Sequence, residues 1–173
     1  QIMPPDDKET STMVRSDGTY ASLPLKKDTI SITIAQTRVN GVDGKNPAKD
    51  IKNNLDYMLE CIDIAQGYGG RSDLICFHEF PIVGFSNWSR EDHYRIAIEV
   101  PGPETEEIGK KCQDYGCYIV FGTYAKDPDW PDHILHLMVL MGPDGNVIAK
   151  HWKQRNVRGL FPGSEQYTSA IYD

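Results

Sequence analysis

Apolar residues in the first half of the chain follow first the period of a strand and then that of a helix. In residues 29–36 three isoleucines alternate with hydroxylated side chains, which predicts a half-buried strand. Asn46-Pro47 then supplies a helix cap and a proline for a first helical turn, and apolar residues follow at helical spacing. The continuous apolar run of residues 74–77 predicts a strand covered on both faces. These three elements follow the order β-α-β. Residues 94–100 then fit a short strand or a turn of helix.

The second half of the chain predicts one more helix and then hairpins. A helix is expected over residues 104–115, because acidic residues gather near its start and lysines follow, which complements the helix dipole. Strands are expected over residues 117–124 and 134–141. Residues 142–145, Gly-Pro-Asp-Gly, form a strong turn signal, and residues 147–153 are the returning arm of a hairpin.

Size and charge restrict the classes of protein and partner. The chain has 173 residues with 39% hydrophobic and 25% charged positions, which is ordinary for one globular α/β domain. Its formal net charge of −7 argues against nucleic acid or an anionic membrane as a partner. No apolar run approaches the ~20 residues of a membrane span, and no signal sequence is evident. We expect a flexible extension over residues 1–27 and a folded domain over residues 28–173.

Cysteine, histidine and glycine spacing gives no sign of a metal or a cofactor. The four cysteines show neither CxxC spacing nor the density of a disulfide scaffold, so we expect free thiols that only pack, in a cytoplasmic protein: Cys61, Cys76, Cys112 and Cys117. His133 and His136 lie three residues apart on a predicted strand and would point to opposite faces, which disfavours a shared zinc ion. The glycines of residues 67–70 lack the context of a phosphate-binding loop.

Two charged residues stand where predicted strands end. Glu79 follows the strand of residues 74–77, and Lys153 ends the arm of residues 147–153. In α/β proteins ligands gather beyond the carboxyl ends of strands, so the two side chains could share one pocket. Partial burial would raise the pKa of Glu79 toward that of a general base, and Lys153 would stabilise an oxyanion. On residue type alone, a surface carboxylate and a solvated lysine are the simpler interpretations.

Four segments together resemble the nitrilase, or carbon–nitrogen hydrolase, superfamily, and the likeness runs from about Ile30 to Asp173. No single motif is decisive, but their order and spacing are fairly specific. They are Leu74–Phe77 with Glu79-Phe80-Pro81, Val100–Thr105, Gly116–Tyr124, and Asp144–Lys153.

The resemblance implies a four-layer αββα sandwich and hydrolysis of non-peptide carbon–nitrogen bonds through a Glu, Lys and Cys triad. Carried onto this chain, it makes Glu79 the general base and Lys153 the group that stabilises the tetrahedral intermediate. Lys150 is the rival lysine, but the family's catalytic lysine follows an aromatic or basic pair, which fits His151-Trp152-Lys153. The resemblance therefore favours catalytic roles for Glu79 and Lys153 over the simpler interpretation as solvated side chains.

The resemblance also implies a small-molecule substrate and a pocket built partly by neighbouring subunits, so a homo-oligomer is expected. Phe80, Phe85 and Trp88 are candidates to line this pocket, although packing explains each of these aromatic residues equally well. Small amides, nitriles and carbamoylated amines are all compatible substrates.

This sequence departs from the family pattern at several positions. The nucleophilic cysteine lies on a later strand in the family, beyond Asp173, so we expect an incomplete sandwich with an exposed apolar sheet face and a missing carboxy-terminal part of the same polypeptide. A second glutamate that usually follows the lysine is absent from residues 154–163, and Glu165 is not its equivalent. His136 replaces a frequent asparagine.

Three functions are compatible with the sequence. The first is an amidase-type hydrolase in which a thiolate forms an acyl-enzyme and Glu79 activates water. The second is a non-catalytic interaction protein on the same scaffold, which a downstream sequence without the cysteine would favour. The third is a generic ligand-binding α/β domain, which no specific residue supports.

Overall fold

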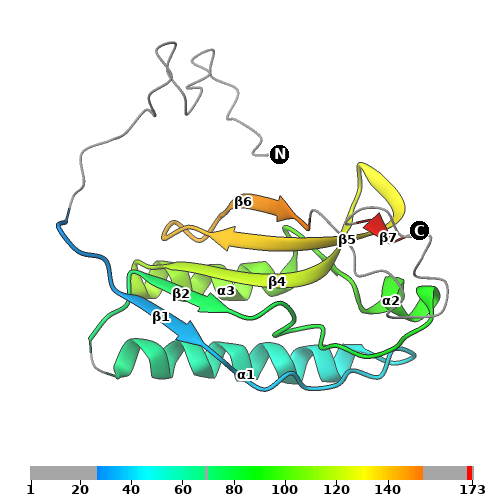
Figure 1. Cartoon of the computed structure of the whole chain (residues 1–173), viewed down its shortest axis with the longest axis horizontal. Coiled ribbons are helices and arrows are strands. Elements are labelled where there is room, and N and C mark those ends of the chain that lie inside the picture. Colours follow the sequence, from blue (N-terminus) through cyan, green and yellow to red (C-terminus); the bar gives the residue numbers. More distant parts are fainter. Residues whose placement is uncertain (1–26, 69, 154–170, 173) are drawn as a thin grey trace, which may run out of the picture.

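A computed structural model describes residues 27–68, 70–153 and 171–172 (Figure 1). Almost all of the extension predicted for residues 1–27 lies outside the described residues. The predicted loop of residues 154–163 lies outside them too, as does Glu165.

The strands form one mixed sheet with the order β1-β2-β4-β5-β6. The first three of these strands are parallel, and β4, β5 and β6 form an antiparallel meander, as the predicted β-α-β unit and later hairpins require. Two short strands join at the side, where β3 pairs with β4 and β7 with β5. The strands are β1 (Ile32–Ala35), β2 (Leu74–Phe77), β3 (Ile98–Glu99), β4 (Tyr118–Asp127), β5 (Trp130–Met141), β6 (Val147–Trp152) and β7 (Ile171–Tyr172).

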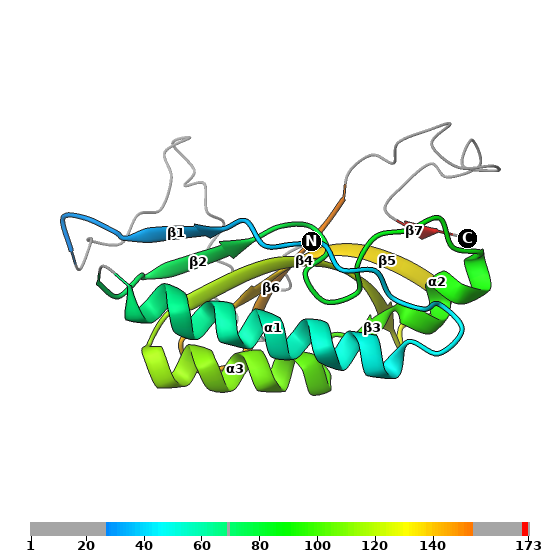
Figure 2. The ribbon, with the colours of Figure 1, turned by 90° about the horizontal axis from the view of Figure 1, so that it is seen from below.

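Two long helices lie side by side against the same face of the sheet, as Figure 2 shows. They are α1 (Ala48–Gly67), which follows Pro47, and α3 (Pro103–Tyr115). Gly116 ends α3 in the left-handed conformation with φ 62°, which a glycine adopts without steric cost. The ambiguous segment of residues 94–100 contains both predicted elements, because the short helix α2 (Arg90–Ile96) ends there and β3 follows.

The core lies between these helices and the sheet. Alternate residues of β4 and β5 point toward the helices and are fully buried, and the register sets them opposite each other in pairs such as Phe121 with Val139. Ile62 of α1 and Ile108 of α3 close over them. Removing such branched and aromatic side chains from water supplies the main driving force for folding.

The opposite face of the sheet is apolar and partly exposed. Ile32 and Ile34 of β1 are 50% and 79% exposed, and Tyr118 of β4 is 42% exposed. Leu74 and Cys76 of β2, expected to be covered on both faces, lie between them on this face and are only partly buried. The described residues therefore form one helix layer and one sheet, which is half of the expected four-layer sandwich. None of the described helices is long and apolar enough to cross a membrane.

Candidate active site

The structure brings Glu79 and Lys153 together. Glu79 follows the carboxyl end of β2, and Lys153 follows that of β6, which runs in the same direction as β4 and hence as β2. Lys153 Nζ donates to Glu79 Oε1 at 2.8 Å. The Lys153 and Glu79 side chains are 29% and 47% exposed, so the ion pair is partly open to solvent. This is the meeting at two strand ends that the sequence predicted.

Lys150 points to the other side of the sheet. The register sets it opposite Val139, whose side chain faces the helices. Its Nζ donates to the carbonyl oxygen of Val100 at 2.5 Å and lies 3.5 Å from Asp127 Oδ2. These partners belong to the β3–α3 connection and to β4. Lys150 therefore links the helix layer to the sheet and does not contact Glu79.

His136 also contacts Glu79, although the sequence analysis assigned no role to this residue beyond the replacement of an asparagine. It lies on β5 opposite Tyr124, and its Nε2 is 2.9 Å from Glu79 Oε1. The carbonyl oxygen of His136 also accepts the Lys153 N–H at 3.0 Å. In β5 His136 lies on the face away from the helices, and the register of β4, β5 and β6 brings it to Glu79.

Two nitrogen donors decide the charge of Glu79. The hydrogen bond with His136 and then that with Lys153 lower the pKa of Glu79 to about 2, although partial burial acts in the opposite direction. The sequence-based expectation of a raised pKa is therefore wrong. The reason is that the hydrogen bonds with His136 and Lys153 stabilise the ionised form and together outweigh the loss of hydration that burial causes. Glu79 is consequently a carboxylate across the whole neutral pH range.

The backbone around Glu79 is held by the residue before it. His78 Nδ1 accepts the Phe80 N–H at 3.2 Å, so in the neutral ring Nε2 carries the proton and donates to Thr37 Oγ1 at 2.9 Å. The carbonyl oxygen of His78 accepts the Gly122 N–H at 3.2 Å. Burial lowers the pKa of His78, which favours this neutral form. The turn that presents Glu79 is thus fixed to β4 and to the segment after β1.

Gly122 leaves the space that this turn occupies. A Cβ at Gly122 would lie 2.4 Å from the Glu79 carbonyl oxygen and 2.7 Å from its Cα, and neither backbone atom can turn aside. We therefore expect Gly122→Ala to lower the free energy of unfolding by about 1–3 kcal/mol and to displace Glu79. Urea unfolding of the variant measures this loss. Gly41→Ala is the matched control, because nothing lies within 4 Å of its added Cβ. Equal stability of the two variants would contradict the close approach.

A cavity of about 550 Å³ opens beside Glu79. Phe80 and Phe85, two of the predicted pocket residues, line it together with Thr37 and Val39. The Phe80 and Phe85 rings stack with centroids 5.4 Å apart, so one aromatic wall runs from the core to the cavity. Trp88, predicted with them, packs elsewhere: its Nε1 donates to the Val42 carbonyl oxygen at 3.1 Å, and it is not among the lining residues.

The four cysteines are free thiols, and the described contacts of Glu79 involve none of them. Cys117 directly precedes Tyr118, which pairs with Leu74, so it lies at the opposite end of the sheet from Glu79. Cys112 is buried on α3, and Cys61 lies on α1. In the described part of the chain, no group of three His, Cys, Asp or Glu side chains is placed to hold a metal ion.

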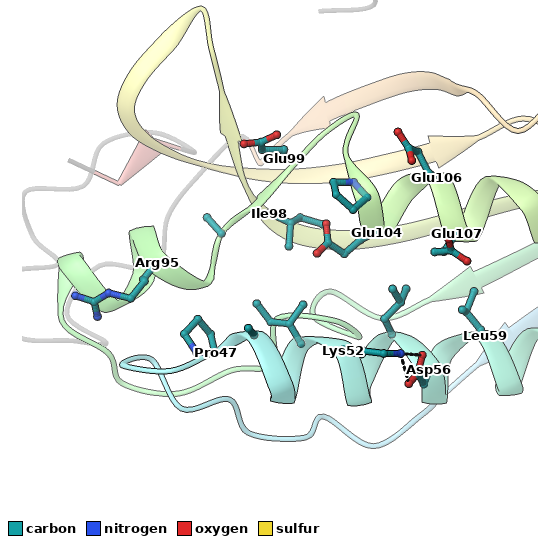
Figure 3. Close-up of a pocket in the computed structure, with 15 residues that line it drawn as sticks. Pro47, Lys52, Asp56, Leu59, Arg95, Ile98, Glu99, Glu104, Glu106 and Glu107 are labelled. Atoms are coloured by element: carbon teal, nitrogen blue, oxygen red, sulfur yellow. Dashed lines mark hydrogen bonds and ion pairs between the residues drawn. The ribbon is translucent and has the colours of Figure 1, made fainter.

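A larger cavity, of about 680 Å³, lies between α1 and the start of α3 (Figure 3). Its rim contains Glu104, Glu106 and Glu107, which stand in the first turns of α3, where carboxylates complement the helix dipole. Lys52 on the facing helix pairs with Asp56 of its own helix. Helix stability thus explains these charges, and the cavity contains neither Glu79 nor Lys153.

Comparison with known proteins gives a consistent family. Residues 31–172 match the family described as carbon–nitrogen hydrolase. A formamidase of Bacillus cereus (strain B4264) is 30% identical over 107 residues, which are 60% of this chain and 31% of the formamidase. A formamidase of Bacillus thuringiensis (strain Al Hakam) is 28% identical over the same shares of the two chains. This chain therefore spans about a third of the length of the curated relatives that it matches.

Solved structures share the fold. An N-terminal amidase with a bound Gln-Gly peptide aligns with a TM-score of 0.61 at 17% identity, over 74% of this chain and 28% of the amidase. The NitFhit protein of C. elegans aligns with a TM-score of 0.60 at 15% identity, over 82% of this chain and 32% of that chain. At such identities the likeness is one of fold, and it agrees with an incomplete sandwich of the nitrilase type.

Proposed function

Because this chain belongs to the carbon–nitrogen hydrolase family, we propose that the complete protein hydrolyses a small amide, with Glu79 as general base and Lys153 as oxyanion stabiliser. The observation that supports this most is the 2.8 Å contact between Lys153 Nζ and Glu79 Oε1 beyond two strand ends. It sets a base and a fixed positive charge at one point, beside a cavity of about 550 Å³ that suits a small substrate.

The proposed reaction uses Glu79 in both of its halves. A thiol loses its proton to Glu79 while its sulfur attacks the amide carbon, and the charge that develops on the carbonyl oxygen is stabilised by the Lys153 ammonium. The carbon–nitrogen bond then breaks, and Glu79 returns the proton to the leaving ammonia. In the second half, Glu79 takes a proton from water, the hydroxide attacks the thioester, and the thiol leaves with that proton. The products are a carboxylic acid and ammonia.

In this proposal the thiol belongs to a cysteine outside residues 1–173, as the resemblance to the family implies, and the described contacts of Glu79 involve none of Cys61, Cys76, Cys112 and Cys117. The remainder of the polypeptide would also cover the exposed sheet face around Ile32 and Ile34, because unpartnered apolar faces of this kind favour association. The relatives, of which this chain spans about a third, have the length that such a second half needs.

Ammonia release by the full-length protein tests the proposal. We expect at least one small amide, among formamide, acetamide and propionamide, to yield ammonia, and prior alkylation with iodoacetamide to prevent it. Short nitriles and N-carbamoyl amines are the matched comparison, because their hydrolysis also breaks carbon–nitrogen bonds and releases ammonia but starts from a different functional group.

A folded full-length protein that releases no ammonia from any of these compounds would contradict the proposal. It would favour the other interpretation of the sequence, a non-catalytic interaction protein on the same scaffold. Activity that survives alkylation would instead contradict the thiol mechanism. The proposed role of Glu79 in forming and hydrolysing an acyl-enzyme would then be wrong.

A further inference from the structure

His136 contacts both of the charged residues in the candidate site. Its Nε2 lies 2.9 Å from Glu79 Oε1, and its carbonyl oxygen accepts the Lys153 N–H at 3.0 Å. One residue of β5 therefore fixes the side chain of the proposed base and the backbone of the proposed oxyanion donor. A shift of His136 would move both groups together.

The imidazole has little freedom to turn. Its side chain is only 4% exposed. The Phe80 and Tyr124 rings lie 5.0 and 5.1 Å from it between centroids, and Phe80 is itself buried. Packing thus holds the ring with Nε2 toward Glu79, so the ring can hold the carboxylate in turn. A group fixed in this way costs little conformational entropy when the reaction begins.

The hydrogen-bond chemistry sets the direction of the contact. An ionised carboxylate only accepts hydrogen bonds, so His136 Nε2 is protonated and donates a hydrogen bond to Glu79. The Lys153 contact uses the same oxygen, Oε1. We propose that His136 is a positioning residue: it and Lys153 together anchor Glu79 Oε1, and Oε2 is the oxygen that exchanges the proton with the nucleophile. This inference rests on the proposed function of Glu79.

The titratable groups around the imidazole come from several elements. Glu79 faces it from the end of β2, Lys153 from the end of β6, and Tyr124 from β4. The ring of His93, on α2, lies 5.2 Å from the Tyr124 ring between centroids. Burial lowers the pKa of His93. Glu79 is the acidic side chain among these groups, so replacement of His136 acts first on its carboxylate.

Two replacements of His136 separate hydrogen bonding from packing. The amide nitrogen of glutamine can take the place of Nε2 as a donor, whereas leucine fills space without one. We expect His136→Leu to lower kcat/KM for the amide hydrolysed by the full-length protein about 10- to 100-fold, the size of one hydrogen bond to a charged group. His136→Gln should stay within a few-fold of wild type, as should the control His151→Leu, whose side chain is exposed.

A carbon-13 NMR titration of the Glu79 carboxyl group gives a readout that needs no turnover. In wild type Glu79 should remain ionised between about pH 4 and 6, because its pKa is lowered to about 2. In His136→Leu the titration should move up toward the ordinary range, and in His136→Gln it should move less. An unchanged titration in His136→Leu would overturn the contact, and equal losses of kcat/KM in the leucine and glutamine variants would overturn the positioning role. If wild type hydrolyses none of the tested compounds, the proposed function fails while the titration still decides whether His136 holds Glu79.

Discussion

Replacing Glu79 with glutamine is expected to lower kcat of the full-length protein by roughly 10²-fold or more while the protein still folds. Glutamine has the same shape and can still accept the hydrogen bonds of Lys153 and His136, which are 2.8 and 2.9 Å from Glu79 Oε1. It cannot take a proton from a thiol or from water. The substitution therefore removes the chemistry of the base and keeps most of its contacts, and steady-state ammonia release measures the loss.

Glu60→Gln is the matched control for this substitution, because Glu60 is an exposed glutamate on α1, away from the site. We expect it to leave kcat unchanged. Retention of more than about a tenth of the wild-type kcat in Glu79→Gln would contradict the assignment, since loss of a general base costs roughly 10²-fold or more.

The stability of the same variant depends on pH in a predictable direction. The folded-state pKa of Glu79 lies near 2, below the ordinary glutamate value of 4.5, so its ionised form stabilises the folded protein above about pH 4.5. This contribution is lost as the pH falls from about 4.5 toward 2. Glu79→Gln should accordingly be less stable than wild type at neutral pH and approach it in acid, as thermal unfolding at several pH values would measure.

Replacing Lys153 with alanine is expected to reduce kcat on the order of 10²-fold or more, the loss that follows removal of an oxyanion donor. The ammonium of Lys153 is the cation that meets Glu79, at 2.8 Å, and it would stand where charge develops on the substrate oxygen. Its removal leaves the thioester-forming step without that stabilisation. The measurement is kcat for the amide that releases ammonia in the full-length protein.

Lys150→Ala is the control that the strand register provides. Lys150 lies three residues before Lys153 and donates to the Val100 carbonyl oxygen on the opposite side of the sheet. We expect this variant to change kcat little and to lower stability by about 1 kcal/mol, the net value of one hydrogen bond. The reverse ranking of the two variants would show that the wrong lysine had been assigned.

Local sequence patterns predict much of this fold. The alternation of residues 29–36 corresponds to β1, the apolar run of residues 74–77 corresponds to β2, and the Gly-Pro-Asp-Gly signal of residues 142–145 joins β5 to β6. Such elements follow from side-chain periodicity and turn chemistry, which act over a few residues. The meeting of Glu79 and Lys153 also follows from a general rule, because both stand beyond the carboxyl ends of parallel strands.

Features that depend on strand register cannot be predicted from local sequence patterns. His136 meets Glu79 only because β5 pairs with β4 and β6 at one particular offset, and a slip of one residue would turn its ring to the helix side. The pKa of Glu79 follows from this contact, so the expectation based on burial alone had the wrong sign. The short strand β7 escaped prediction because its two residues pair with β5 from far along the chain.

The most direct test of the central claim is a double-mutant comparison of Glu79 and Lys153, using kcat of wild type, Glu79→Gln, Lys153→Ala and the double variant. Residues that act as one catalytic unit show losses that do not add. We therefore predict that the double variant loses no more than a few-fold beyond the worse single variant. If the two losses multiply, or if either single variant keeps near wild-type activity, Glu79 and Lys153 are not one reaction centre, and their 2.8 Å contact is a structural ion pair.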